Sequence, residues 1–182
     1  MNRQPLIAHI PALRRYARAL TGDAWACDDL VQDTLERACA KWRLWLAGSD
    51  LRAWLFTIMH NLYVSQVRLR VRQGDLAHPL DLSELDQEPA APASGADSAI
   101  DLQRCLLRLP EEQRAVLLLV TLEDLSYAEV AKITGVPVGT VMSRLSRARS
   151  RLQELMDISA DPPARGSVAA TESVTPPLRR LK

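Results

Sequence analysis

The sequence contains few cysteines: only Cys27, Cys39 and Cys105 occur among 182 residues, and no two of them form a C-x-x-C pair. An odd number of thiols without metal-ligand spacing indicates free cysteines in a reducing compartment rather than a disulfide framework or a zinc site. The three histidines are scattered, and neither a nucleophile–base pair nor a glycine-rich phosphate loop is evident. We therefore expect no metal, no cofactor and no catalysed reaction.

Long apolar runs are missing as well. The longest, Ala115 to Val120, is far shorter than the ~20 residues that span a bilayer. The amino terminus has neither the apolar stretch nor the cleavage site of a secretory signal. These absences predict a cytoplasmic protein without membrane insertion. The apolar fraction of 47% is nevertheless large enough for a buried core.

One segment lacks positive charge altogether, although the formal net charge of the whole chain is only +1. Residues 73–100 carry six acidic and no basic side chains, whereas residues 1–72 carry 11 basic and six acidic ones. The acidic segment also contains three prolines and two glycines. This composition predicts a flexible, mostly extended linker.

Helical periodicity, in contrast, runs through most of the chain, and no stretch alternates convincingly at period two. We expect an all-α fold of two small helical domains, residues 1–72 and 99–156, joined by an acidic linker over 73–98 and followed by a disordered tail over 157–182. Three helices are predicted in the first domain, with apolar faces formed by Leu6, Ile10, Leu13, Ala17 and Leu20, by Val31, Leu35, Ala38 and Trp42, and by Leu51, Trp54 or Leu55, Ile58 or Met59, Leu62 and Val67.

Several helix ends carry a recognisable chemical signal. The first helix is expected to end near Gly22, and the third to begin with Ser49 or Asp50 as its N-cap. In the second domain, Pro110 and the two glutamates after it open another helix, because proline loses nothing there and acidic groups stabilise the positive end of the helix dipole.

The strongest local signal is a capping box, Ser126-Tyr-Ala-Glu129, whose two polar side chains satisfy free backbone donors at a helix start. The short helix that follows is expected to stop at Thr134-Gly135, since glycine adopts the turn conformation that other residues resist. Val136-Pro137 then begins a second helix over about 138–156. Helix, glycine turn and helix at this spacing predict a helix-turn-helix.

The second helix of this motif has two different faces. Its apolar residues Val141, Leu145, Ala148, Leu152 and Leu155 fall within a sector of about 80° and should be buried. The opposite side carries serines, which let a helix approach base edges, and arginines, which bind guanine or phosphate. This pattern favours DNA reading over a merely solvated basic face. The expected DNA-binding residues are Thr140, Met142, Ser143, Arg144, Ser146, Arg147, Arg149 and Arg151.

Two sets of motifs, in order along the chain, are similar to those of the extracytoplasmic-function (ECF) sigma factors of the sigma-70 family. Three segments resemble sigma region 4: Leu109–Arg114, Leu125–Ala131 and Gly135–Arg149. Two segments resemble regions 2.2 to 2.4: Asp28–Asp33 and Leu51–Leu62. The resemblance covers about residues 5–155. It implies a region 2 bundle of three or four helices and a region 4 helix-turn-helix that directs RNA polymerase to promoters.

The resemblance implies that the first domain binds the coiled coil of the polymerase β′ subunit. Asp29, Gln32 and Asp33 match the family's clamp-binding positions, and we assign Leu30 and Glu36 to the same site. By helical spacing alone, the acidic residues lie opposite the apolar face of their helix, an arrangement that an ordinary solvated helix face would also have. The second domain would bind the −35 element and the β flap.

The resemblance also implies a site for the −10 element. Asn61 matches an asparagine that helps to capture a base flipped from the −10 strand, and Trp45 lies in the loop that contributes to this capture. Arg68, with further arginines after it, would hold phosphates nearby. Trp42 and Trp54, at helical spacing, are expected to pack in the core.

Three other functions are compatible with parts of this sequence. An enzyme is disfavoured by the missing catalytic constellations, and a dimeric helix-turn-helix regulator would leave residues 23–72 without a role. The most serious alternative is a sigma-like mimic that sequesters an anti-sigma factor. Such mimics usually carry a phosphoreceiver domain and need no basic recognition face, which this chain retains. We expect an alternative sigma factor, controlled by an anti-sigma factor and active in a stress response, with a segment reminiscent of general-stress members.

Overall fold

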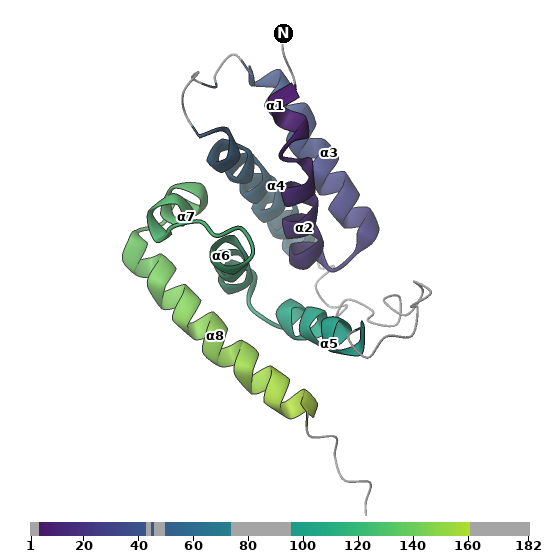
Figure 1. The fold of residues 1–182 in the computed structure, drawn as a ribbon, viewed down its shortest axis with the longest axis vertical. Helices are drawn as coiled ribbons and strands as arrows, with labels where there is room; N and C mark the ends of the chain where they lie inside the picture. The colour runs from purple at the N-terminus through teal and green to yellow at the C-terminus, as the bar shows by residue number, and fades with distance from the viewer. Residues whose placement is uncertain (1–3, 43–44, 46–49, 74–95, 161–182) are drawn as a thin grey trace, which may run out of the picture.

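The computed structural model describes residues 4–42, 45, 50–73 and 96–160, and within these ranges the regular elements are helices without strands. The all-α prediction is therefore confirmed. In chain order the helices are α1 (Gln4–Ile7), α2 (Ile10–Thr21), α3 (Ala24–Ala40), α4 (Leu51–Gln73), α5 (Ala96–Leu107), α6 (Glu111–Thr121), α7 (Tyr127–Thr134) and α8 (Val138–Ala160) (Figure 1).

The first predicted helix is in fact two. A turn at Ala8-His9 separates α1 from α2, and Pro11 stands at the start of α2, where its missing N–H leaves no helical bond unmade. Gly22 ends α2 with φ 77°, as predicted for a glycine stop. The carboxylate of Asp23 then caps α3 by accepting a bond from the N–H of Ala26.

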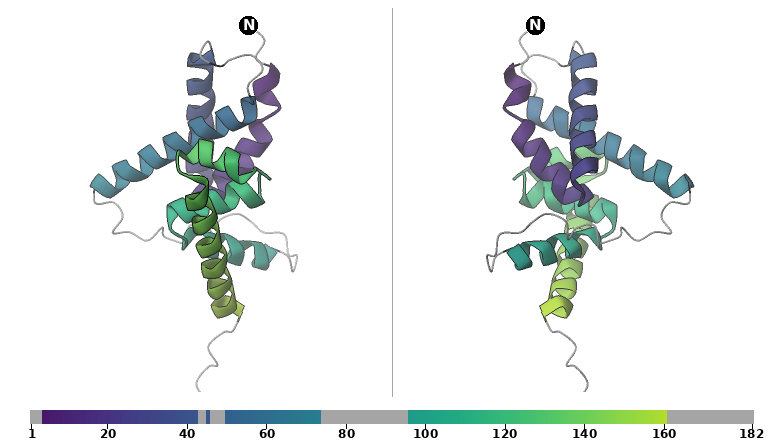
Figure 2. Two further views of the ribbon diagram at one scale, coloured as in Figure 1. Left: turned by 90° about the vertical axis from the view of Figure 1, so that its left-hand side faces the viewer. Right: turned by 90° about the vertical axis from the view of Figure 1, so that its right-hand side faces the viewer.

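Of the two candidate caps for α4, Asp50 takes the role. Its Oδ1 accepts bonds from the N–H groups of Arg52 at 2.9 Å and of Ala53 at 3.2 Å. The buried residues of α4 fall within a sector of roughly 200° at 100° per residue, so the helix is covered from several sides. Only its carboxy-terminal end projects away from the other helices (Figure 2).

Two predicted boundaries were wrong by a few residues. Helix α5 already begins at Ala96, inside the segment predicted as linker. Helix α8 continues to Ala160, beyond the predicted end at 156, because no helix breaker precedes Pro162. The remaining linker residues 74–95 and the tail residues 161–182 lie outside the described part of the chain.

The helix-turn-helix geometry is confirmed. The N–H of Ser126 donates to the Glu129 carboxylate at 2.8 Å, and the N–H of Glu129 donates to the Ser126 hydroxyl at 3.3 Å. Gly135 ends α7 with φ 68°. The predicted apolar stripe of α8 faces inward: Val141, Leu145, Ala148 and Leu155 are buried and Leu152 is half-buried.

The two predicted domains pack against each other, and their apolar residues form one continuous core. Helix α7 packs on α4, and α2 packs on α5 and α6, so the helix-turn-helix lies against the amino half (Figure 1). Tyr16 and Phe56 meet edge to face within this core, with ring centroids 5.4 Å apart. The broad buried face of α4 allows it to contact helices of both halves at once.

Candidate nucleic-acid and protein interfaces

The outward face of α8 carries most of the residues predicted to bind the −35 element. Met142 is 53% exposed, and Ser146, Arg147, Arg149 and Arg151 are also exposed, while Thr140 and Ser143 are half-buried. This face lies opposite the buried stripe that packs on α6 and α5. A helix presented in this way has its polar side free to enter a major groove.

Two arginines of this face are held by neighbours on the same helix. Arg147 donates to the Ser143 hydroxyl at 3.3 Å, and Ser143 in turn donates to the carbonyl of Thr140 at 3.0 Å. Arg151 instead forms an exposed ion pair of 3.0 Å with Glu154, three residues later. Ser143 and Arg147 therefore form a small polar pair at the centre of the outward face, whereas Arg151 lies towards the far end of the helix.

Arg144 differs from the other arginines of α8. Its guanidinium forms an ion pair with Glu112 in the first turn of α6, and only 20% of its side chain is exposed. The prediction grouped it with the free DNA-binding side chains, but here it points towards α6. Arg144 is therefore available to DNA only if it exchanges Glu112 for a phosphate or a base.

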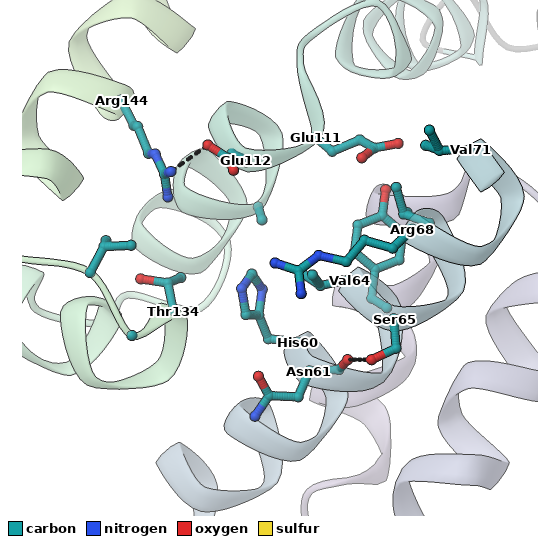
Figure 3. A pocket seen from close by; sticks show the side chains of 15 residues that line it. His60, Asn61, Val64, Ser65, Arg68, Val71, Glu111, Glu112, Thr134 and Arg144 are labelled. Carbon is teal, nitrogen blue, oxygen red and sulfur yellow. Dashed lines mark hydrogen bonds and ion pairs between the residues drawn. The ribbon is translucent and has the colours of Figure 1, made fainter. Parts of the chain in front are cut away.

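A groove of about 540 Å³ lies between α4, α6 and the turn that joins α7 to α8. Figure 3 shows side chains that line it. Asn61 and Arg68 both line it from α4, because residues seven positions apart share a helix face. Arg144 lines it from α8. Residues predicted to read two different promoter elements thus surround one groove, while Trp45, the third residue predicted for the −10 element, is not among its lining residues.

His60 lies in the same groove, one residue before Asn61. It is buried, and its Nδ1 has no hydrogen-bond partner. Burial, together with the smaller effect of the neighbouring Arg144 charge, lowers the pKa of His60 to about 4, and Glu112 acts in the opposite direction. The imidazole is therefore neutral at pH 7, beside the Arg144–Glu112 ion pair (Figure 3).

Trp45 packs against Trp42 rather than standing free. The two ring centroids are 5.1 Å apart, and Trp45 is half-buried. Trp42 and Trp54 both pack against the core, as their spacing predicted. Trp25, in contrast, is 86% exposed at the start of α3.

The acidic face of α3 is exposed. Asp29, Gln32 and Glu36 point outward, and the amide of Gln32 donates to the Glu36 carboxylate at 3.0 Å. Partial burial and the charges of Asp29 and Glu36 raise the pKa of Asp33. The negative groups thus repel one another on the free surface, and a basic partner would relieve that repulsion. The assignment of Leu30 to the polymerase-binding site was wrong, because Leu30 is fully buried and belongs to the core rather than to this face.

Sequence reasoning missed the polar contacts between the two halves. Arg15 and Arg52 of the amino half bind the buried carboxylate of Glu123, and Arg114 of α6 binds the hydroxyl of Tyr63 on α4. These partners lie 51 to 108 positions apart in the sequence. The one available signal was Glu123 itself, a charged residue that, with Asp124, interrupts the mostly apolar Leu117–Leu125 stretch.

No cluster of three or more histidine, cysteine, aspartate or glutamate side chains that could hold a metal ion was found in residues 4–42, 45, 50–73 and 96–160. In the same part of the chain, no helix combines the length and apolar character needed to cross a bilayer.

Comparison with known proteins accounts for both halves. Residues 6–60 match the family described as the Sigma2 domain of PhyR, and residues 99–152 match Sigma-70, region 4. The sigma factor RpoE of Bartonella quintana, solved in complex with the anti-sigma factor NepR, matches with a TM-score of 0.72 and 38% identity over 86% of this chain and 96% of that chain. The PhyRSL–NepR complex of Sphingomonas sp. Fr1 matches with a TM-score of 0.61 and 26% identity, over 90% and 94%.

Curated relatives agree with these matches. The ECF RNA polymerase sigma factor SigC of Mycobacterium tuberculosis is 33% identical over 78% of this chain and 81% of its own length. The ECF RNA polymerase sigma factor EcfG of Rhodopseudomonas palustris is 40% identical over 154 residues, which cover 85% of this chain and 84% of that protein. At this identity and coverage, the chain belongs to the ECF RNA polymerase sigma factors.

Proposed function

We propose that this sigma factor binds core RNA polymerase through the acidic face of α3 and reads the −35 element through the outward face of α8. Asn61 and Arg68 on α4, with Trp45 before it, contact the −10 element in this proposal. One observation supports this proposal most strongly. The amino half exposes an acidic face on α3, and the carboxy half exposes a serine–arginine face on α8. The activity is one of binding and positioning, in which no residue acts as a catalyst.

An anti-sigma factor is the expected regulator. The support is the 38% identical RpoE of Bartonella quintana, whose solved structure contains the anti-sigma factor NepR. Because the acidic face of α3 and the outward face of α8 are both exposed, an anti-sigma factor would compete with polymerase for α3, with DNA for α8, or with both.

One observation favours a second candidate, a sigma-like mimic. Residues 6–60 match the Sigma2 domain of PhyR, and a PhyR of Bartonella quintana is described as an anti-anti-sigma factor in its solved complex with NepR. A mimic has no need for a face that reads DNA. The Ser143–Arg147 pair exposed on α8 therefore supports the sigma factor over the mimic.

The proposal is tested by measuring affinity for purified core polymerase. The double variant Asp29→Arg with Asp33→Arg replaces two negative charges of the α3 face without touching a buried residue. We expect binding to weaken at least tenfold, because like charges would then face the basic partner helix. The control is Asp101→Arg with Asp157→Arg, which makes the same change in net charge at exposed positions of α5 and α8.

Unchanged affinity in the α3 variant would overturn the polymerase-binding assignment. A wild-type chain that binds core polymerase yet supports no promoter-dependent transcription would favour the mimic. Circular dichroism of each variant establishes that helix content is preserved.

A further inference from the structure

Trp25 differs from the other three tryptophans of the chain. Trp42 and Trp54 pack against the core, and Trp45 packs against Trp42. Trp25, near the start of α3, is instead 86% exposed. Tryptophan carries a large apolar ring and is enriched among the residues that contribute most to protein–protein binding. A ring that the fold leaves in water is therefore a candidate contact for a partner.

Helix α3 does not depend on this ring. Asp23 caps the helix by accepting a hydrogen bond from the N–H of Ala26 at 2.6 Å, and the side chain of Trp25 takes no part in that bond. Tryptophan also has a lower helix propensity than alanine or leucine. Replacing Trp25 should therefore leave the fold intact, and its exposure has no structural explanation within the chain.

Trp25 lies on the acidic face of α3, one turn before Asp29. Positions 25, 29, 32 and 36 are all exposed, and at 100° per residue they fall within a sector of about 60°. At a rise of about 1.5 Å per residue, the distance from Trp25 to Glu36 along the helix is roughly 16 Å. The ring therefore extends the surface that we assign to polymerase, and a partner helix lying along that surface would reach it.

The ring of Trp25 has a carboxylate beside it. Side chains four positions apart on a helix are neighbours, so Asp29 lies next to Trp25 on the same face. Asp28, on the flank of this face, is paired with Arg14 at 3.1 Å. The face of an indole ring attracts a cation, and a carboxylate accepts hydrogen bonds from one. Arginine suits both groups at once, because its planar guanidinium can stack on the ring while its N–H groups donate to the carboxylate.

We propose that Trp25 and Asp29 together bind one arginine side chain of the polymerase helix that lies along the acidic face of α3. This two-residue arginine site deepens the proposed function and rests on it, because the arginine belongs to the partner of that face. Charge complementarity and the continuity of the face favour this occupant. The site adds an aromatic anchor to a surface whose other members are polar.

The first test measures the affinity of full-length variants for purified core polymerase. Trp25→Leu keeps an apolar side chain and removes the ring, so binding should weaken about tenfold or more. Trp25→Phe keeps a smaller ring, so its loss should be clearly less. The matched control is Ile7→Ala, which removes an exposed apolar side chain from α1 and should bind like the wild type.

The second test is a double-mutant cycle of Trp25→Leu with Asp29→Asn. If both side chains bind the same arginine, the double variant should lose several-fold less affinity than the product of the two single losses. The control cycle pairs Trp25→Leu with Glu36→Gln, at the other end of the face. Its two effects should simply multiply, because residues roughly 16 Å apart share no partner group.

Urea denaturation followed by circular dichroism establishes that each variant is as stable as the wild type. Wild-type affinity of Trp25→Leu, alongside weak binding by Asp29→Arg with Asp33→Arg, would overturn the arginine site and leave the polymerase-binding assignment in place. Strictly multiplicative effects of Trp25→Leu and Asp29→Asn would also overturn the site, as would equal losses in Trp25→Phe and Trp25→Leu. Wild-type affinity in both the Trp25→Leu and the Asp29→Arg, Asp33→Arg variants would instead overturn the proposed function itself.

Discussion

Arg114 of α6 donates a hydrogen bond of 2.6 Å to the hydroxyl of Tyr63 on α4, and both side chains are buried. The same guanidinium donates to the carbonyl of Leu107 at 3.0 Å, which fixes the end of α5. Burial raises the pKa of Tyr63, whereas the charge of Arg114 acts in the opposite direction. The arginine of the Leu-Pro-Glu-Glu-Gln-Arg motif therefore links three helices, and one of these belongs to the amino half.

Tyr63→Phe should lower the free energy of unfolding by about 1–3 kcal/mol, because it leaves a buried guanidinium N–H without its acceptor. Urea denaturation followed by circular dichroism measures the change. Ser65→Ala on the same helix is the control: Ser65 is exposed and its hydroxyl donates to the carbonyl of Asn61, so the expected change is within about 0.5 kcal/mol. Equal stability of Tyr63→Phe and the wild type would show that water replaces the tyrosine hydroxyl.

The buried His60 predicts how stability depends on pH. Its pKa is about 4 in the folded chain, below the value of about 6.5 expected when unfolded, so the unfolded state binds the proton more strongly. The contribution of neutral His60 to the free energy of unfolding is fully present above pH 6.5. It is lost as the pH falls from there to about 4, by on the order of 1 kcal/mol per pH unit. Denaturation curves between pH 7 and pH 4.5 measure this slope.

The comparison for this prediction is His60→Gln, which cannot titrate and should lose stability less steeply over the same interval. Parallel curves for His60→Gln and the wild type would mean that other groups account for the acid sensitivity.

Two glycines predict opposite responses to alanine. At Gly22 the φ of 77° is unfavourable for alanine, and an added Cβ would lie 2.5 Å from Cδ1 of Leu107, so Gly22→Ala should destabilise the chain by about 1–3 kcal/mol. At Gly139, within α8, an added Cβ meets no atom within 4 Å. Gly139→Ala should therefore stabilise the helix by about 0.5–1 kcal/mol. Thermal unfolding distinguishes the two, and a destabilised Gly139→Ala would contradict the helix argument.

Local chemistry explains what the sequence could predict. The capping box at Ser126, the glycine stop at Gly135 and the apolar stripe of α8 all depend on residues a few positions apart, so their spacing determines the result. The ion pair between Arg144 and Glu112 joins residues on different helices, and its existence depends on how α8 packs on α6. No spacing rule predicts it.

The same reasoning explains the missed contacts between the halves. Helical spacing placed the acidic face of α3 correctly, but it could not show that α4 is buried on more than one side. The contacts of Glu123 with Arg15 and Arg52 follow from that packing. Leu30 was misassigned because the family's motif spans a whole helical turn, of which one side is core.

The last prediction separates base reading from phosphate binding on α8. Arg147 and Ser143 are bonded to each other near the centre of the outward face, whereas Arg151 lies one turn further along and pairs with Glu154. A centrally placed side chain reaches base edges, where a good contact contributes roughly 1–3 kcal/mol of discrimination. A peripheral one meets phosphates, which are the same for every sequence.

Transcription from a library of −35 substitutions should therefore respond differently to the two changes. Arg147→Ala should relax the preference among −35 sequences, and Ser143→Ala should do so more weakly because it also releases Arg147. Arg151→Ala should weaken all promoters alike and lower the salt dependence of binding by about one phosphate contact. Helix content must be equal in all three variants. If Arg147→Ala lowers every promoter by the same factor, α8 enters the groove with a different side, and the base-reading role passes to residues nearer its flanks.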